Sequence, residues 1–148
     1  LYFIRYLMAM YKIENEENIE ASKKNMLLII LNIIFFISFV VFAWFNLNDK
    51  DAPLWVTIYM LAAISCGLAV FHLYFPAFYL LLIIFYMIYA ALLFFAKDGV
   101  WAWIIKYNHP SLTESMQATR PYIEKTREFF GLLIISGALL INYFAGKE

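Results

Sequence analysis

Four long apolar runs constrain this chain more than any other feature of its sequence. They cover residues 26–47, 54–75, 77–96 and 129–145. A helix of about 20 residues crosses the hydrocarbon core of a bilayer, so each run is long enough, or nearly so, to span a membrane. Because lipid offers the backbone no hydrogen-bond partner, each run is expected to be helical rather than extended. The sequence therefore predicts an all-α integral membrane bundle of four transmembrane helices.

Composition leads to the same class. The chain has 148 residues, of which 65% are hydrophobic, whereas an ordinary soluble domain is about 45–50% apolar. A soluble protein of this size has too little interior to bury so much apolar surface. The 11 basic and 11 acidic residues balance, so no net field favours nucleic acid. We expect membrane lipids as the surroundings and no nucleic-acid partner.

The runs also predict the domain organisation. Residues 1–25 form an N-terminal arm, polar from Lys12 onward, that precedes the first run. Residues 26–148 form a single transmembrane domain. Pro76 separates the second run from the third, and proline breaks or kinks a helix. A helical hairpin is expected there, because one kinked helix over 54–96 would far overshoot the bilayer.

An extramembrane segment, 97–128, separates the last two runs. Residues 100–105 are apolar and rich in Trp but too short to span, which predicts an interfacial segment before the last helix. Ser111 and Glu114 have the spacing of a capping box, which predicts a short helix there. Pro121 suits the first turn of a helix that continues into the fourth span.

Two charged clusters flank the runs. One closes the first run and the other opens the last, and four spans place both on the same side of the membrane. We call them together the polar cluster, and its candidate site residues are Asn48, Asp49, Asp51, Glu124, Arg127 and Glu128.

Three interpretations of the polar cluster stay open. Arg127 could pair with Asp49 or Asp51 and pin two helix ends together. Several hard oxygen ligands could instead bind a divalent cation or a polar headgroup. An acid/base catalytic pair is the third possibility. The chain has no His-Glu-x-x-His, paired Cys-x-x-Cys or Gly-rich phosphate motif, so we predict no cofactor and leave the metal unassigned.

Small residues mark where helices could pack. Ala63 and Gly67 lie four apart in the second run, and Gly131 and Gly137 lie in the fourth. Small side chains let helix backbones approach closely in membranes. We therefore predict these four positions at helix interfaces.

Two asparagines interrupt apolar runs. Asn32 lies in the first run and Asn142 in the fourth. An unpaired amide is costly in a lipid environment. We expect an interhelical hydrogen bond to satisfy each of them.

Two short segments resemble the signatures of the transmembrane protein 220 family. Residues 48–59 are similar to its Asn-Asp-Pro-Asp motif, followed by a Trp and a Tyr that match Trp55 and Tyr59. Residues 127–135 are similar to its Arg-Glu pair followed by Gly-Leu and an apolar helix. Lys50 departs from the family's proline, which loosens the turn and adds a positive charge beside the aspartates. The positions that match the family are Asn48, Asp49, Asp51, Trp55, Tyr59, Arg127, Glu128 and Gly131.

The resemblance implies a small polytopic membrane protein with no established activity to carry over. We also expect Trp55 and Tyr59 to lie at helix interfaces, together with the four small residues named above. Because no catalytic constellation is present, we favour an accessory or scaffold subunit that packs against other membrane proteins and has no chemistry of its own. The alternative is binding, or enzymatic handling, of a lipid headgroup or divalent cation at the polar cluster. We expect a bacterial inner membrane, with the N-terminus in the cytoplasm.

Overall fold

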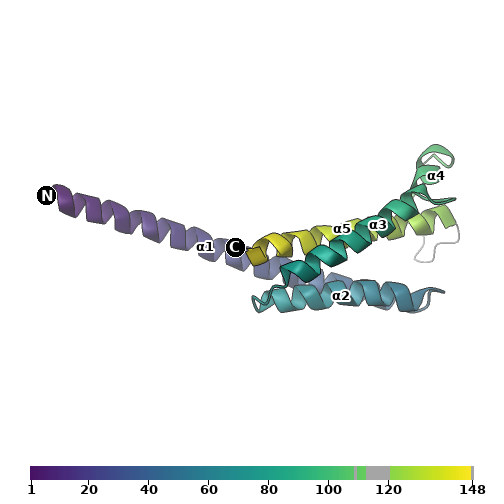
Figure 1. Ribbon diagram of the computed structural model, residues 1–148, viewed down its shortest axis with the longest axis horizontal. Helices are drawn as coiled ribbons and strands as arrows, with labels where there is room; N and C mark the ends of the chain where they lie inside the picture. The colour runs from purple at the N-terminus through teal and green to yellow at the C-terminus, as the bar shows by residue number, and fades with distance from the viewer. Residues whose placement is uncertain (109, 113–120, 148) are drawn as a thin grey trace.

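The structure, a computed structural model, describes residues 1–108, 110–112 and 121–147. That part of the chain contains five helices and no strand (Figure 1). Four of the helices are long and apolar enough to cross a membrane. The predicted all-α bundle is therefore confirmed. The helices are α1 (Tyr2–Phe45), α2 (Ala52–Val70), α3 (Pro76–Phe95), α4 (Val100–Ile105) and α5 (Pro121–Lys147).

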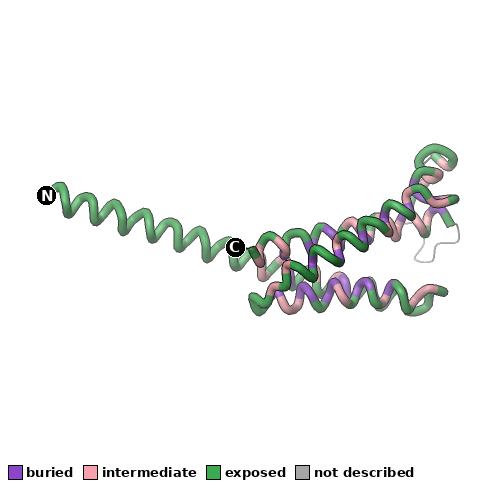
Figure 2. Tube along the Cα trace, viewed as in Figure 1, coloured by how far each residue is buried: buried purple, intermediate pink, exposed green. Residues whose placement is uncertain are grey.

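Helix α1 joins the N-terminal arm and the first span without a break. Its 44 residues contain neither Gly nor Pro, and its polar stretch is rich in Glu and Lys, which are good helix formers. Residues 1–27 are all exposed, and this half of the helix projects away from the bundle (Figure 2). The N-terminal arm is thus helical and continuous with the first span. Its division from the transmembrane domain stays a prediction.

Helix α2 ends at Val70, short of the predicted end at residue 75. The amide of Leu73 donates to the carbonyl oxygen of Leu68 at 3.0 Å, and His72 adopts a left-handed φ of 59°. A 6→1 bond around a left-handed residue is the Schellman ending of a helix. Residues 71–75 therefore form a connection, and the predicted hairpin at Pro76 is confirmed, since α3 begins there.

Helix α5 begins at Pro121 and runs through the fourth span to Lys147, as the proline predicted. The Trp-rich segment forms the one-and-a-half-turn helix α4. Its place in the membrane interface stays a prediction. Glu114, half of the proposed capping box, lies outside the described residues.

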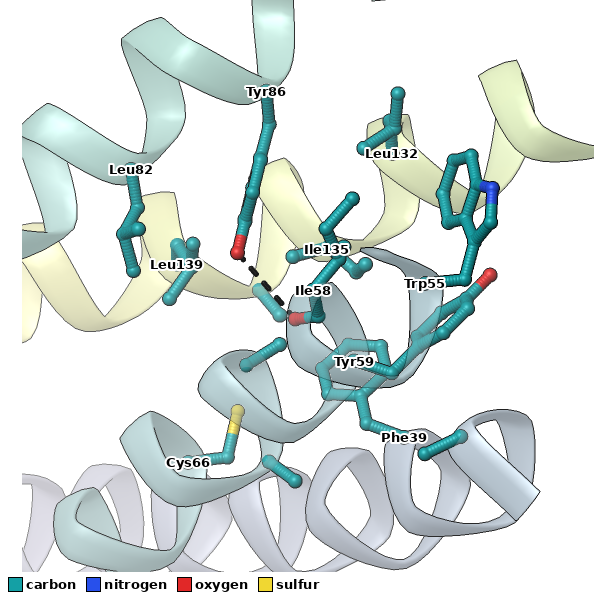
Figure 3. Packing of buried hydrophobic residues seen from close by; sticks show 14 of the residues in the cluster. Phe39, Trp55, Ile58, Tyr59, Cys66, Leu82, Tyr86, Leu132, Ile135 and Leu139 are labelled. Carbon is teal, nitrogen blue, oxygen red and sulfur yellow. Dashed lines mark hydrogen bonds between the residues drawn. The ribbon is translucent and has the colours of Figure 1, made fainter. Parts of the chain in front are cut away.

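The bundle consists of two helix pairs. Helix α1 packs along α2, α3 packs along α5, and the pairs meet mainly between α2 and α5. The core between them is aromatic: Trp55 and Tyr86 are 1% exposed, and the Tyr86 hydroxyl donates to the carbonyl oxygen of Ile58 at 3.4 Å (Figure 3). Leu132, Ile135 and Leu139 of α5 complete it. Many of the remaining large apolar side chains face outward, as expected of a surface covered by lipid.

The two asparagines of the apolar runs bind each other. The Asn32 amide donates to Oδ1 of Asn142 at 2.9 Å, and the Asn142 amide donates to Oδ1 of Asn32 at 2.7 Å. Their second N–H groups donate to the carbonyl oxygen of Leu28 and to Sγ of Cys66. Both side chains are buried, so this amide junction satisfies every amide donor away from water. The expected interhelical hydrogen bond is confirmed, and it links α1 to α5.

The predicted packing positions behave in different ways. Ala63 is fully buried, and a Cβ added to Gly67 would lie 3.3 Å from the Phe36 ring. A Cβ added to Gly131 would lie 2.5 Å from the Tyr59 hydroxyl oxygen, so this glycine permits close contact of α2 and α5. Gly137 differs: it is exposed, and a Cβ there would meet nothing within 4 Å, so it has no packing role between the described helices, and contact with another subunit stays a prediction. It points away from the neighbouring helices of the described chain.

Candidate functional site

Three carboxylates gather at the N-terminal ends of α2 and α5. Asp51 is the N-cap residue of α2, Glu124 lies in the first turn of α5, and Glu128 follows one turn later. Each offers an oxygen within 4.8 Å of the other two. We call these residues the carboxylate triad. The two charged segments that were predicted to share a membrane face thus meet through these side chains.

Local sequence explains why the three side chains converge. The carbonyl oxygen of Asp51 accepts from the amides of Leu54 and Trp55, at 3.0 and 3.3 Å, and so starts α2. The aspartate is consequently held at the helix end, where the dipole favours a negative charge. Glu124 and Glu128 are four residues apart on α5 and therefore share one face of that helix.

Trp55 fixes the position of Asp51. Its indole Nε1 donates to Oδ2 of Asp51 at 2.9 Å, and its side chain is 1% exposed. Its ring stacks on Tyr89 of α3, with centroids 5.7 Å apart. Tyr59, one turn further along α2, lies against Trp55 and Gly131. The aromatic core thus directs the aspartate toward α5.

By the predicted span of residues 129–145, the triad lies just before the apolar part of α5. Burial, and after it the charges of Asp51 and Glu124, together raise the pKa of Glu128 from 4.5 to about 8, while the Trp55 N–H acts in the opposite direction. The pKa of Glu124 is also raised, first by burial and then by Asp51. The three carboxyl groups therefore stand close together at reduced solvation, where ionising all of them at once is unfavourable.

The other members of the polar cluster surround the triad. Asn48 and Asp49 are exposed in the turn before α2, and the charge of Asp49 contributes to the raised pKa of both glutamates. Arg127 is half-buried on α5, and it acts with Lys50 to lower the pKa of Glu124. An ion pair of Arg127 with Asp49 or Asp51 stays a prediction.

The sequence reasoning did not find the role of Trp55 as a donor to the triad. The sequence contains a signal for this contact, because Asp51 and Trp55 lie four residues apart at the start of a helix. At that spacing an indole can reach a carboxylate. Chemically, the triad offers hard oxygen ligands from two helices, which suit Mg²⁺ or Ca²⁺ better than a soft metal.

The fold and the site define a small polytopic α-helical integral membrane protein with an acidic cluster at one end of its bundle. Comparison with protein families gives the particular group. Residues 38–144 match the model described as "Transmembrane family 220, helix", and the chain belongs to this family. The resemblance drawn from the two signature segments is thereby confirmed. No curated protein and no solved structure matches the chain.

Proposed function

We propose that this membrane protein binds a divalent cation at one membrane face through Asp51, Glu124 and Glu128. The observation that carries the proposal is the convergence of three carboxylate oxygens within 4.8 Å, from helices far apart in the sequence. Ca²⁺ takes six to eight oxygen ligands and Mg²⁺ keeps several of its waters. A partly exposed triad supplies the acidic ligands and leaves room for water to complete the shell.

The electrostatics of the triad support a positively charged ligand. Burial and mutual repulsion raise the pKa of Glu124 and Glu128, so ionising all three groups is unfavourable without a counter-charge. A divalent cation supplies that charge between the three oxygens. Lys50, in place of the proline that the family signature carries, adds positive charge nearby and is expected to weaken the affinity.

The ammonium group of a lipid headgroup would meet the same electrostatic demand, because the triad lies at the level where headgroups are found. The two ligands can be separated by experiment. A cation binds in detergent without added lipid, whereas a headgroup ligand requires vesicles that contain an amine lipid. No organic cofactor is part of this proposal.

Isothermal titration of the purified chain with Ca²⁺ and with Mg²⁺ tests the proposal. We expect saturable binding to the wild type and at least a tenfold loss of affinity in Glu128→Gln. The matched control is Glu17→Gln, which removes one acidic group from the projecting half of α1 and should bind normally. Heat of binding that is equal in wild type and Glu128→Gln would contradict the proposal.

A second candidate function is that of an accessory subunit without chemistry of its own. It is supported by the exposed N-terminal half of α1, whose first eleven residues are largely apolar although they project beyond the bundle. A partner subunit could cover that surface. Purification in mild detergent should then yield a stoichiometric partner, which a Phe3→Gln/Leu7→Gln variant loses. A monodisperse monomer from the wild type would contradict this candidate.

The proposal also covers which membrane holds the protein and on which side of it the N-terminus lies. That the chain is an integral membrane protein follows from its four apolar helices and its family. A bacterial inner membrane, with the N-terminus in the cytoplasm, stays our prediction. Cysteine accessibility at Glu20→Cys and Lys50→Cys, measured with a membrane-impermeant reagent in a Cys66→Ser background, tests the orientation.

A further inference from the structure

The short helix α4 presents an apolar surface to its surroundings. Trp101 is 54% exposed, Ile105 is 59% exposed, and Ile104 is also exposed, and at helical spacing these three side chains share one side of α4. Phe95, the last residue of α3, is exposed as well. Contiguous exposed apolar side chains of this size mark a surface that meets lipid or another molecule.

The other side of α4 is anchored to the bundle. Val100 is buried, and the Trp103 ring meets Phe130 of α5 edge to face, with centroids 6.4 Å apart. The Trp103 indole also donates to the carbonyl oxygen of Pro110 at 2.9 Å. Figure 1 shows α4 beside the end of the bundle, level with the start of α2 and not beyond it. The exposed side of α4 therefore points sideways from the bundle, toward the lipid that surrounds an integral membrane protein.

Two exposed lysines bracket this helix. Lys97 precedes α4 and Lys106 is its C-cap residue. The helix has six residues and is therefore about 9 Å long, so both ammonium groups lie near its apolar side. The Lys125 ammonium donates to the carbonyl oxygen of Lys97 at 2.6 Å, which holds this segment against α5. Asp98 is half-buried, and its Oδ1 accepts from the Tyr107 hydroxyl at 3.1 Å.

Helix α5 keeps these lysines apart from the carboxylate triad. Glu124 and Glu128 meet Asp51 of α2, whereas Lys125 meets the end of α3 at Lys97. Neighbouring residues of a helix point about 100° apart, so Glu124 and Lys125 face different helices. Helix α4 packs on α5 and α3, on the side away from α2 in Figure 1. This end of the bundle thus has an acidic side at α2 and a basic side at α4.

We propose that α4 and its two bracketing lysines form a docking surface for acidic phospholipids. Trp101, Ile104 and Ile105 enter the lipid interface, where indole rings are favoured. Lys97 and Lys106 extend to the level of the headgroups and bind their phosphates. An apolar side bracketed by cations is the pattern by which interfacial helices bind anionic lipid. The proposal does not depend on cation binding at the triad.

Quenching of tryptophan fluorescence by brominated lipids tests the proposal. The purified chain is placed in phosphatidylcholine bilayers that contain a small fraction of brominated phosphatidylglycerol or brominated phosphatidylcholine. The Trp101 signal is the difference between wild type and Trp101→Phe. A lysine near an anionic lipid favours it by about fivefold at low salt, so we expect phosphatidylglycerol to be preferred by about 25-fold.

Substitution of the two lysines should remove this preference. In Lys97→Gln/Lys106→Gln the two brominated lipids should quench Trp101 about equally. The matched control is Lys23→Gln/Lys24→Gln, which removes two exposed lysines of α1 before the first span and should keep the preference. In the wild type alone, added salt should weaken the preference, because it screens exposed charges.

Several outcomes would overturn the proposal. Equal quenching by the two lipids in the wild type would show that the surface does not select acidic lipid. A Trp101 signal that neither lipid quenches would show that this side of α4 does not meet lipid. Stronger quenching by brominated phosphatidylethanolamine than by brominated phosphatidylglycerol would favour an amine headgroup instead. A preference that survives both added salt and Lys97→Gln/Lys106→Gln would exclude the lysines as its cause.

Discussion

Two polar junctions connect α5 to the first helix pair and differ in chemistry: the amide junction joins α5 to α1, and the carboxylate triad joins it to the start of α2. Near one end of the α2–α5 interface, the amides of Asn32 and Asn142 exchange two hydrogen bonds, and both groups are neutral and buried. Near the other end, Asp51, Glu124 and Glu128 bring three acidic groups together. The amide junction stabilises the bundle under all conditions. The raised pKa of Glu128 shows that the carboxylate junction disfavours full ionisation, so we expect its contribution to stability to depend on pH, unlike that of the amide junction.

The largest expected effect is at the amide junction. Asn142→Leu should lower the free energy of unfolding by about 2 kcal/mol, because it leaves the buried Asn32 amide without its partner on α5. Thermal unfolding in mild detergent measures the loss. The double variant Asn32→Leu/Asn142→Leu should lose less than the two single variants together, since neither amide is then left unpaired. Additive losses would show that the two amides do not act as a pair.

Neutralising the carboxylate junction should raise the free energy of unfolding, whereas breaking the amide junction lowers it. In EDTA, at a pH above the Glu128 pKa of about 8, Asp51→Asn/Glu128→Gln should raise the free energy of unfolding by about 1 kcal/mol, because it removes repulsion between close like charges. The same variant should lose the stabilisation that Ca²⁺ gives the wild type. Glu17→Gln/Glu20→Gln is the matched control and should leave both quantities unchanged. A destabilised variant in EDTA would mean that the triad is already held by attraction.

The pH dependence of stability also distinguishes the carboxylate junction, which titrates, from the amide junction, which does not. Because the pKa of Glu128 is raised from 4.5 to about 8, the folded state binds more protons than the unfolded state between these values. The contribution of Glu128 is therefore fully present below pH 4.5 and is lost as the pH rises through about 8. Thermal midpoints in EDTA should fall over this range in the wild type and fall less in Glu128→Gln. A midpoint that rises with pH in both proteins would contradict the raised pKa.

The smallest expected effect lies in the connection beside the amide junction. His72 is left-handed at the end of α2, a conformation that glycine adopts without the steric cost of a Cβ. His72→Gly should raise the free energy of unfolding by up to about 1 kcal/mol. Phe71→Gly, at a neighbouring residue with φ of −92°, is the control and should bring no gain. Equal effects of the two glycines would indicate that the backbone conformation at His72 is not the cause.

Much of the fold could be predicted because its causes lie in long stretches of sequence. Apolar runs define membrane spans, and the number of spans predicts that Asp51 and Glu128 lie at the same membrane face. The Asn32–Asn142 bond was predictable for a related reason, since a polar amide among apolar neighbours needs a partner. Such features depend on composition over many residues, and single packing details do not change them.

Other features depend on tertiary contacts that leave little trace in the sequence. Helix α2 ends early because His72 takes a left-handed conformation, which the sequence does not announce with a glycine. Gly137 resembles Gly131 in sequence, but only Gly131 faces another helix. The orientation of Asp51 depends on Trp55, whose ring is in turn fixed by Tyr89 of a third helix. The geometry of the triad follows from this packing.

The unbroken course of α1 gives the amide junction a mechanical consequence at a distance. Asn32 is the first buried residue of the helix, and Tyr2 lies thirty residues away along the same continuous helix. At 1.5 Å per residue this lever is about 45 Å long, so a tilt of about 5° at Asn32 displaces Tyr2 by about 4 Å. A small rotation between the helix pairs would thus be amplified into a movement large enough for a neighbouring molecule to sense.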